Sequence, residues 1–171
     1  INYPVTNGTV FRGRRDAVVT KLNASGNIAF STYLGGIGSD FPSIGGLEVN
    51  GNQVIIGGTT GSPDFPVTDN SNYGGGASDG FAAILNATDG SIITSRIIGG
   101  NRTDFTSTVA FDNNSIFLIS TTLSDDIPAT VGGSLPDTVE NLHITRCSFN
   151  NLNTLYSRYL GGNKSDFVIK A

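Results

Sequence analysis

Apolar and polar residues alternate along short segments of the chain, and turn-forming residues separate these segments. The segment 27–34 alternates in the way that is typical of a strand with one buried face. Continuous apolar runs at 54–56 and 116–119 instead indicate strands that are buried on both faces. The pattern predicts strands at 16–22, 27–34, 43–49, 52–59, 79–85, 91–98, 106–111, 115–121, 142–149, 153–160 and 166–170.

The residues between these segments favour tight turns. Asn50-Gly51 supplies the positive φ that a two-residue hairpin requires. The stretches 23–26, 86–90 and 112–114 are rich in Asn, Asp and Gly and indicate turns of the same kind. The strands they join should therefore pair as antiparallel neighbours.

A seven-residue motif recurs along the chain with nearly constant spacing. Its pattern is G-G-x-x-[ST]-D-F, and its copies are separated by 64 and 62 residues. A second pattern, x-P-x-T, recurs every 62 residues. The first motif lies at 35–41, 99–105 and 161–167, and the second at 3–6, 65–68 and 127–130. Self-similarity over the whole length indicates a single repeat region spanning residues 1–171.

Each full period holds four predicted strands, which is the content of a β-propeller blade. We therefore expect an all-β fold of antiparallel four-stranded blades, with approximate boundaries at 1–63, 64–126 and 127–171. The period exceeds that of common blades, and the excess lies in loops such as 61–78. About 2.7 copies are present, so the last blade and the ring are incomplete. A β-solenoid is the structural alternative, although its coils are usually shorter.

Composition supports this fold and excludes several classes of function. Gly is abundant, at 23 residues, and Met is absent, so a helical bundle is excluded. The formal net charge of −4 argues against nucleic acid as a partner, and Arg12, Arg14 and Arg15 are expected to form a solvated turn. No apolar run is long enough for a membrane-spanning helix. Cys147 is alone, which excludes an intrachain disulfide and a cysteine metal site.

Several phrases of the repeat resemble the bacterial and archaeal β-propeller repeat called SBBP. They are S-T-Y-L-G-G at 31–36, D-F-P-V-T at 64–68, the Gly-rich loop at 73–79, D-A-V-V-T-K-L-N at 16–23 and Y-S-R-Y-L-G-G at 156–162. The resemblance covers nearly all of the chain, although the second copy departs from the pattern: R-I-I-G-G at 96–100 lacks the Tyr, and D-I-P at 126–128 replaces D-F-P. It implies a secreted or surface-exposed protein, and it supplies no catalytic motif.

An incomplete ring leaves strand edges unpaired, and three explanations remain open. The chain, which begins at Ile1 rather than Met, is a processed product or a piece of a longer propeller. Several chains close one ring together. Alternatively, the open edge accepts a strand from a neighbouring copy and builds a head-to-tail assembly. We expect a piece of a larger protein or assembly rather than an isolated monomer, its partners being further blades or copies of itself.

Asp40, Asp104 and Asp166 are the polar residues that recur most clearly, each between a Ser or Thr and a Phe. If equivalent loops converge, their carboxylates form a weak Ca²⁺ site, the only cofactor this sequence suggests. Alternatively, each Asp caps its own turn by accepting backbone N–H groups. The Phe that follows each Asp is expected to anchor the core between blades. His143 is the only histidine, so neither a multi-histidine metal site nor a catalytic triad is indicated.

Sequons for N-glycosylation occur at six positions, and turn formation is the alternative reason for an Asn at each of them. These candidates are Asn7, Asn23, Asn86, Asn101, Asn113 and Asn163.

The sequence thus predicts a non-catalytic structural or adhesive module, extracellular or at the cell surface, within a larger propeller, fibre or oligomer. One alternative is a carbohydrate- or ligand-binding propeller segment that uses the loops around Tyr73 and Leu135. Another is a fragment of a propeller enzyme whose active site lies elsewhere.

Overall fold

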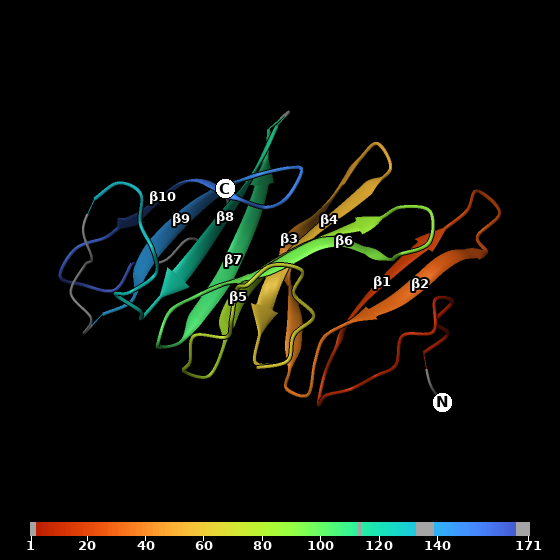
Figure 1. Cartoon of the computed structure of the whole chain (residues 1–171), viewed down its shortest axis with the longest axis horizontal. Helices are drawn as coiled ribbons and strands as arrows, with labels where there is room; N and C mark the ends of the chain where they lie inside the picture. Colours follow the sequence, from red (N-terminus) through yellow and green to blue (C-terminus); the bar gives the residue numbers. More distant parts are fainter. Residues whose placement is uncertain (1–2, 113, 133–138, 167–171) are drawn as a thin grey trace.

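The computed structural model describes residues 3–112, 114–132 and 139–166. Within these residues the fold is all-β, with ten strands and no helix (Figure 1). The strands are β1 (Ala17–Leu22), β2 (Ile28–Leu34), β3 (Asp40–Asn50), β4 (Gln53–Thr60), β5 (Asp79–Asn86), β6 (Ile92–Ile98), β7 (Asp104–Phe111), β8 (Ser115–Thr122), β9 (Asn141–Ser148) and β10 (Thr154–Leu160).

The first ten predicted strands are all confirmed, and no end differs by more than three residues. The largest difference is at β3, which begins at Asp40 because Asp40 already pairs with Thr60 of β4. The predicted segment 166–170 lies, beyond its first residue, outside the described part of the chain.

The strands form antiparallel sheets in the order β3-β4-β5-β6 and β7-β8-β9-β10, with a two-stranded sheet β1-β2. These sheets do not follow the expected boundaries at 63/64 and 126/127. Each four-stranded sheet joins the last two strands of one sequence period to the first two of the next. The long loop 61–78 returns the chain so that β4 pairs with β5, whereas the short connection 35–39 carries it to a new sheet.

The three sheets follow one another in chain order across the molecule (Figure 1). Apolar side chains fill the two spaces between them. The first core lies between β1-β2 and the central sheet, and includes Phe30, Phe81 and Leu85. The second lies between the central sheet and β7-β10, and includes Ile84, Leu118 and Leu152. The central sheet therefore has an apolar core on each of its faces.

The apolar run 54–56 is buried on both faces, as predicted, because Val54 and Ile56 belong to the first core and Ile55 to the second. The run 116–119 differs. Ile116 and Leu118 are buried, but Phe117 and Ile119, on the opposite face of β8, remain half-exposed. No further sheet covers that face within the described residues.

Gly57 allows the central sheet to approach β7. A Cβ atom at this position would lie 2.3 Å from Cγ2 of Val109 and 3.3 Å from Cδ2 of Leu118. Only glycine leaves room for Val109 at this distance.

The x-P-x-T segments cover the outer edges of the sheets. Beside β6, the Thr68 N–H donates to the Ser95 carbonyl at 2.9 Å, and the Ser95 N–H donates to Thr68 Oγ1 at 2.9 Å. The same pair of bonds joins Thr6 to Ser31 of β2 and Thr130 to Ser157 of β10. These segments occupy edges that could otherwise pair with another chain.

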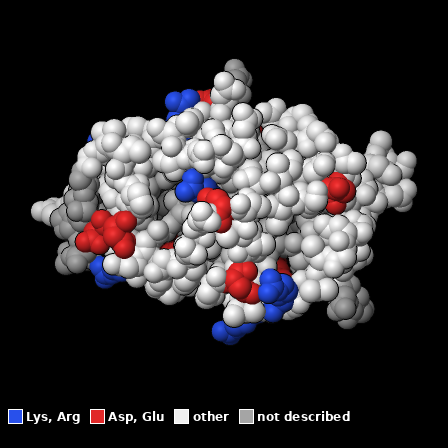
Figure 2. All heavy atoms as spheres, viewed as in Figure 1, with Lys and Arg blue, Asp and Glu red and all other residues white. Residues whose placement is uncertain are grey.

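Charged side chains are scattered over the face shown in Figure 2, with uncharged surface between them. Arg12, Arg14 and Arg15 are exposed, and Arg12 pairs with Asp64 at 2.7 Å. No helix in the described residues has the length and apolarity needed to cross a membrane.

Candidate functional site

The recurring Asp of the seven-residue motif organises the connection between successive sheets. The Asp104 carboxylate accepts hydrogen bonds from the Gly100 N–H at 2.7 Å, from Ser124 Oγ at 2.9 Å and from Thr122 Oγ1. Asp40 accepts the equivalent bonds from the Gly36 N–H, Ser62 Oγ and Thr60 Oγ1. Asp166 accepts the N–H of Gly162 at 3.1 Å. This is the capping arrangement that the sequence offered as the alternative to a metal site.

Asp40, Asp104 and Asp166 are not brought together as one Ca²⁺ site. Asp40 begins β3, Asp104 begins β7, and Asp166 follows β10, so the three lie at the first strand of the central sheet and at the two edge strands of the sheet β7-β10. No group of three or more His, Cys, Asp or Glu side chains that could hold a metal ion occurs among the residues the structure describes.

A second acidic residue lies beside Asp104. Asp79, the first residue of β5, is fully buried, and one of its oxygens accepts the Gly74 N–H. Its other oxygen has no hydrogen-bond partner in the described structure. Burial, together with the nearby negative charge of Asp104, raises the pKa of Asp79 to about 7. Burial also raises the pKa of Asp104, although its hydrogen bonds oppose this effect.

This acidic pair belongs to the repeat. Asp16 lies beside Asp40, since a Cβ atom at Gly35 would be 2.9 Å from the Asp16 carboxylate and 2.7 Å from that of Asp40. In the third copy Asn141 takes the place of the first acid, beside Asp166. The sequence analysis did not recognise the pair, although the recurrence of Asp16 and Asp79 at the start of equivalent strands was its signal.

The expectation that the motif Phe anchors the core is wrong for the two described copies. Phe41 is 43% exposed and Phe105 is 45% exposed. Successive strand residues point to opposite faces, so burial of Asp40 and Asp104 directs each following Phe outward. The Arg15 guanidinium lies 5.3 Å from the centre of the Phe41 ring. The third Phe of the motif, Phe167, lies outside the described residues.

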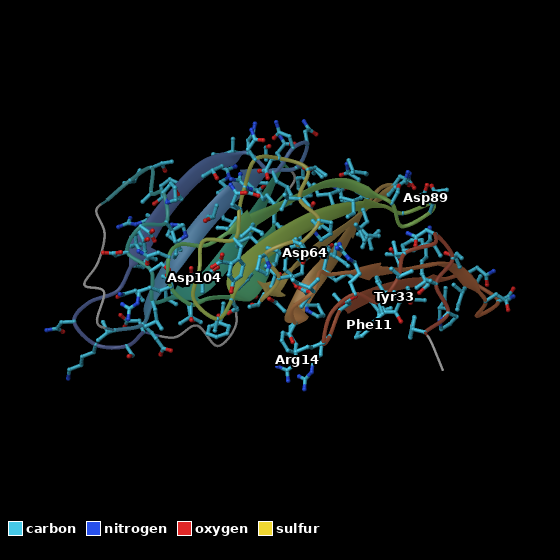
Figure 3. All side chains as sticks on the ribbon, turned by 60° about the horizontal axis from the view of Figure 1, so that its bottom comes forward. Phe11, Arg14, Tyr33, Asp64, Asp89 and Asp104 are labelled. Atoms are coloured by element: carbon cyan, nitrogen blue, oxygen red, sulfur yellow. The ribbon has the colours of Figure 1, made fainter. Side chains whose placement is uncertain are left out.

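Phe41 and Phe105 line a shared pocket of about 560 Å³ where the central sheet meets β7. Arg14 lies at this pocket, and Figure 3 shows its side chain extending outward from the fold. The remaining lining is mostly backbone and small side chains, contributed by Gly38, Ser39, Thr59, Gly61, Ala77 and Ser78. The volume is within the range of small-molecule sites.

The Tyr73 side chain is held by contacts within the protein. The Tyr73 hydroxyl donates to the Gly76 carbonyl at 3.2 Å, and the ring packs against the first core. Leu135, the other loop residue named for a ligand site, lies outside the described residues.

Three of the sequon asparagines, Asn7, Asn23 and Asn86, shape turns. Asn23 Oδ1 accepts the Ser25 N–H at 3.0 Å, and Asn86 Oδ1 accepts the Thr88 N–H at 2.8 Å. Asn7 Oδ1 accepts the Thr9 hydroxyl at 2.9 Å. Asn101 and Asn163 are exposed, and Asn113 lies outside the described residues.

The single cysteine and histidine are buried. Burial raises the pKa of the Cys147 thiol to about 11 and lowers that of His143 to about 4. The His143 ring packs edge-on against Tyr159, with 4.8 Å between ring centres, and its Nδ1 lies 3.1 Å from the Thr145 hydroxyl. At neutral pH both side chains are uncharged, and both lie on the inner face of the sheet β7-β10.

Comparison with models of known protein families found no match for this chain, and comparison with curated proteins found none either.

Proposed function

We propose that this chain is a non-catalytic structural module of an SBBP-like β-propeller repeat. It packs its sheets against further sheets of the same kind in an extracellular or surface assembly. The observation that carries the proposal is the outer face of β7-β10, which repeats the central sheet's buried face.

The two faces share several apolar positions at a spacing of 62, although Arg146 stands on the outer face at the position of Ile84. Ile55, Ala82 and Ile98 face the second core from the central sheet and are 0%, 1% and 8% exposed. Their equivalents on the outer face are apolar as well, but they are only half-buried. These equivalents are Phe117, Ile144 and Leu160.

An arginine at equivalent positions strengthens the correspondence. Arg96 of the central sheet reaches across the second interface, and its Nη1 donates to the Leu152 carbonyl at 2.7 Å. Arg158 occupies the same position 62 residues later, and the buried Nε atoms of both arginines have no hydrogen-bond partner in the described structure. The outer face therefore presents both the apolar residues and the donor that join one sheet to the next.

The arrangement of the strands supports a propeller-like repeat. Each four-stranded sheet is an antiparallel meander in chain order, and successive sheets stack face to face. Both are properties of propeller blades. The recurring acids accept hydrogen bonds from nearby backbone N–H and hydroxyl groups. The side chains best suited to catalysis therefore serve to hold the structure together.

The size of the particle tests this proposal. Light scattering over a range of protein concentrations should show species larger than 17.8 kDa. Phe117→Glu places a charge on the outer face and should abolish these species. Ile37→Glu alters a loop residue that is 61% exposed and should leave them unchanged. A strictly monomeric wild-type chain at all concentrations would contradict the proposal.

A further inference from the structure

The pocket between the central sheet and β7 combines two aromatic walls with one charged group. Phe41 and Phe105 supply the walls, and the pocket's volume of about 560 Å³ leaves room for a molecule of several rings. Of the described residues that line it, Arg14 is the only one with a charged side chain, and none is acidic. The pocket therefore suits a ligand that is apolar over most of its surface and negatively charged at one end.

The two phenylalanine rings are available to a ligand. Phe41 and Phe105 are 43% and 45% exposed, and within the described chain neither ring contacts another aromatic ring. The Arg15 guanidinium lies 5.3 Å from the centre of the Phe41 ring and restrains it by a cation–π contact. An aromatic group can therefore pack against both rings without displacing a core side chain.

The Arg14 guanidinium is available to an anion. The Arg14 N–H donates to the Gly38 carbonyl at 2.7 Å, which holds the residue beside the pocket. No carboxylate of the described residues forms an ion pair with its side chain, whereas the neighbouring Arg12 is paired with Asp64. Because a guanidinium binds a carboxylate through two parallel hydrogen bonds, Arg14 can hold an anionic group at the mouth of the pocket.

The aromatic walls belong to the repeat, but the positive charge does not. Phe41 and Phe105 both occupy the last position of the seven-residue motif. Arg14 stands two residues before the acid that precedes β1, and the next copy has Ala77 at the equivalent position. The arginine thus gives this one pocket a preference for anions that the framework of the repeat does not require.

We propose that the pocket binds a small aromatic carboxylate. The ring system of the ligand packs between Phe41 and Phe105, and its carboxylate pairs with the Arg14 guanidinium. A neutral aromatic molecule meets the same walls but lacks the ion pair, and so binds more weakly. This site goes beyond the proposed function, because it lies within one chain and does not depend on assembly.

Fluorescence anisotropy of 2-naphthoate tests the proposal, since the chain contains no Trp whose emission would interfere. Titration with the full chain should raise the anisotropy to saturation. Arg14→Gln should weaken binding of 2-naphthoate by about fivefold and leave binding of the neutral 2-naphthamide unchanged. Phe105→Ala should weaken binding of both molecules. Added salt should weaken binding of 2-naphthoate to the wild type only through the ion pair, and so have little effect on Arg14→Gln.

Two matched variants make the same changes away from the pocket. Arg12→Gln removes the same charge from a side chain that Asp64 already pairs. Phe11→Ala removes a ring that is 53% exposed beside Tyr33 (Figure 3). Neither residue lines the pocket, so both variants should bind both molecules as the wild type does. Circular dichroism establishes that each variant is folded.

Three results would overturn the proposal. The first is the absence of saturable binding of 2-naphthoate to the wild type. The second is equal affinity of the wild type for 2-naphthoate and 2-naphthamide. The third is equal weakening by Arg12→Gln and Arg14→Gln, which would show that only the net charge of the chain matters. Phe117→Glu, which tests assembly, should leave binding unchanged, so the two proposals stand or fall separately.

Discussion

Two neighbouring acids recur in this repeat, and the hydrogen bonds around each acid decide which of the two is neutral. Asp104 has three hydrogen-bond donors for its charge, whereas Asp79 has one backbone donor and a buried oxygen without a partner. The third copy has Asn141 at the position of Asp79. An amide has the shape of a protonated carboxyl and carries no charge, so the chain itself supplies the neutral form in one copy.

We predict that Asp79→Asn stabilises the protein above neutral pH. A folded-state pKa of about 7, against an ordinary value of 3.8, means that stability falls as pH rises from about 4 to about 7. The variant lacks this loss and should gain about 1–3 kcal/mol over wild type at pH 8, with little difference at pH 4. Urea denaturation at both pH values measures the gain.

The comparison with wild type isolates Asp79 from His143. Burial lowers the pKa of His143 to about 4, so its contribution is lost as pH falls from about 6.5 to about 4, in both proteins. The charged or titratable neighbours of Asp79 are Asp104 and Tyr73. The exposed Asp89 serves as the control (Figure 3), and Asp89→Asn should not give the gain at pH 8. An equal gain in both variants would refute the assignment to Asp79.

At the scale of the strands, the distance between two sheets depends on where a strand carries a glycine instead of a larger residue. β4 carries Gly57 opposite Val109 of β7, and the two sheets meet at van der Waals distance there. The apolar alternation that predicts a strand does not show which glycine faces a neighbouring sheet, because that depends on the partner of each strand.

We predict that Gly57→Ala destabilises the protein by about 1–3 kcal/mol, because the new methyl group overlaps Val109 and the sheets must separate. Val109→Ala removes the atoms that collide, so the double variant should recover part of the stability lost by Gly57→Ala. Thermal and urea denaturation of the four proteins completes a double-mutant cycle. Strictly additive losses would show that the two residues do not interact.

At the scale of the whole molecule, local features were predictable and long-range pairing was not. The ten strands follow from alternation and turn chemistry, as at 27–34 and Asn50-Gly51. The grouping into sheets depends on the loop 61–78, whose path leaves no periodic signal. The outward position of Phe41 follows from the burial of Asp40, and hydrophobicity alone predicts the reverse. The acidic pair could be recognised only once the structure placed its two acids side by side in two copies of the repeat.

We predict that the stack opens from β1-β2. Its β1 strand has one paired edge, whereas β5 has two paired edges and both faces covered. Amide hydrogens of β1 should therefore exchange with solvent at least tenfold faster than those of β5 under native conditions. Hydrogen exchange followed by mass spectrometry or NMR provides the measurement. Slower exchange in β1 than in β5 would contradict this order of opening.

The sheets are offset from the sequence period. This offset determines what happens when the chain is cleaved in a loop and when whole copies of the repeat are gained or lost. Each of the first two sequence copies contributes strands to two sheets, so a cut in the loop 61–78 falls within a sheet rather than between sheets. The two fragments would remain joined by the full ladder from Gln53↔Asn86 to Thr60↔Asp79. Conversely, gain or loss of one whole period preserves every pairing on either side. Copies of this repeat can therefore be added or removed without leaving any new strand unpaired.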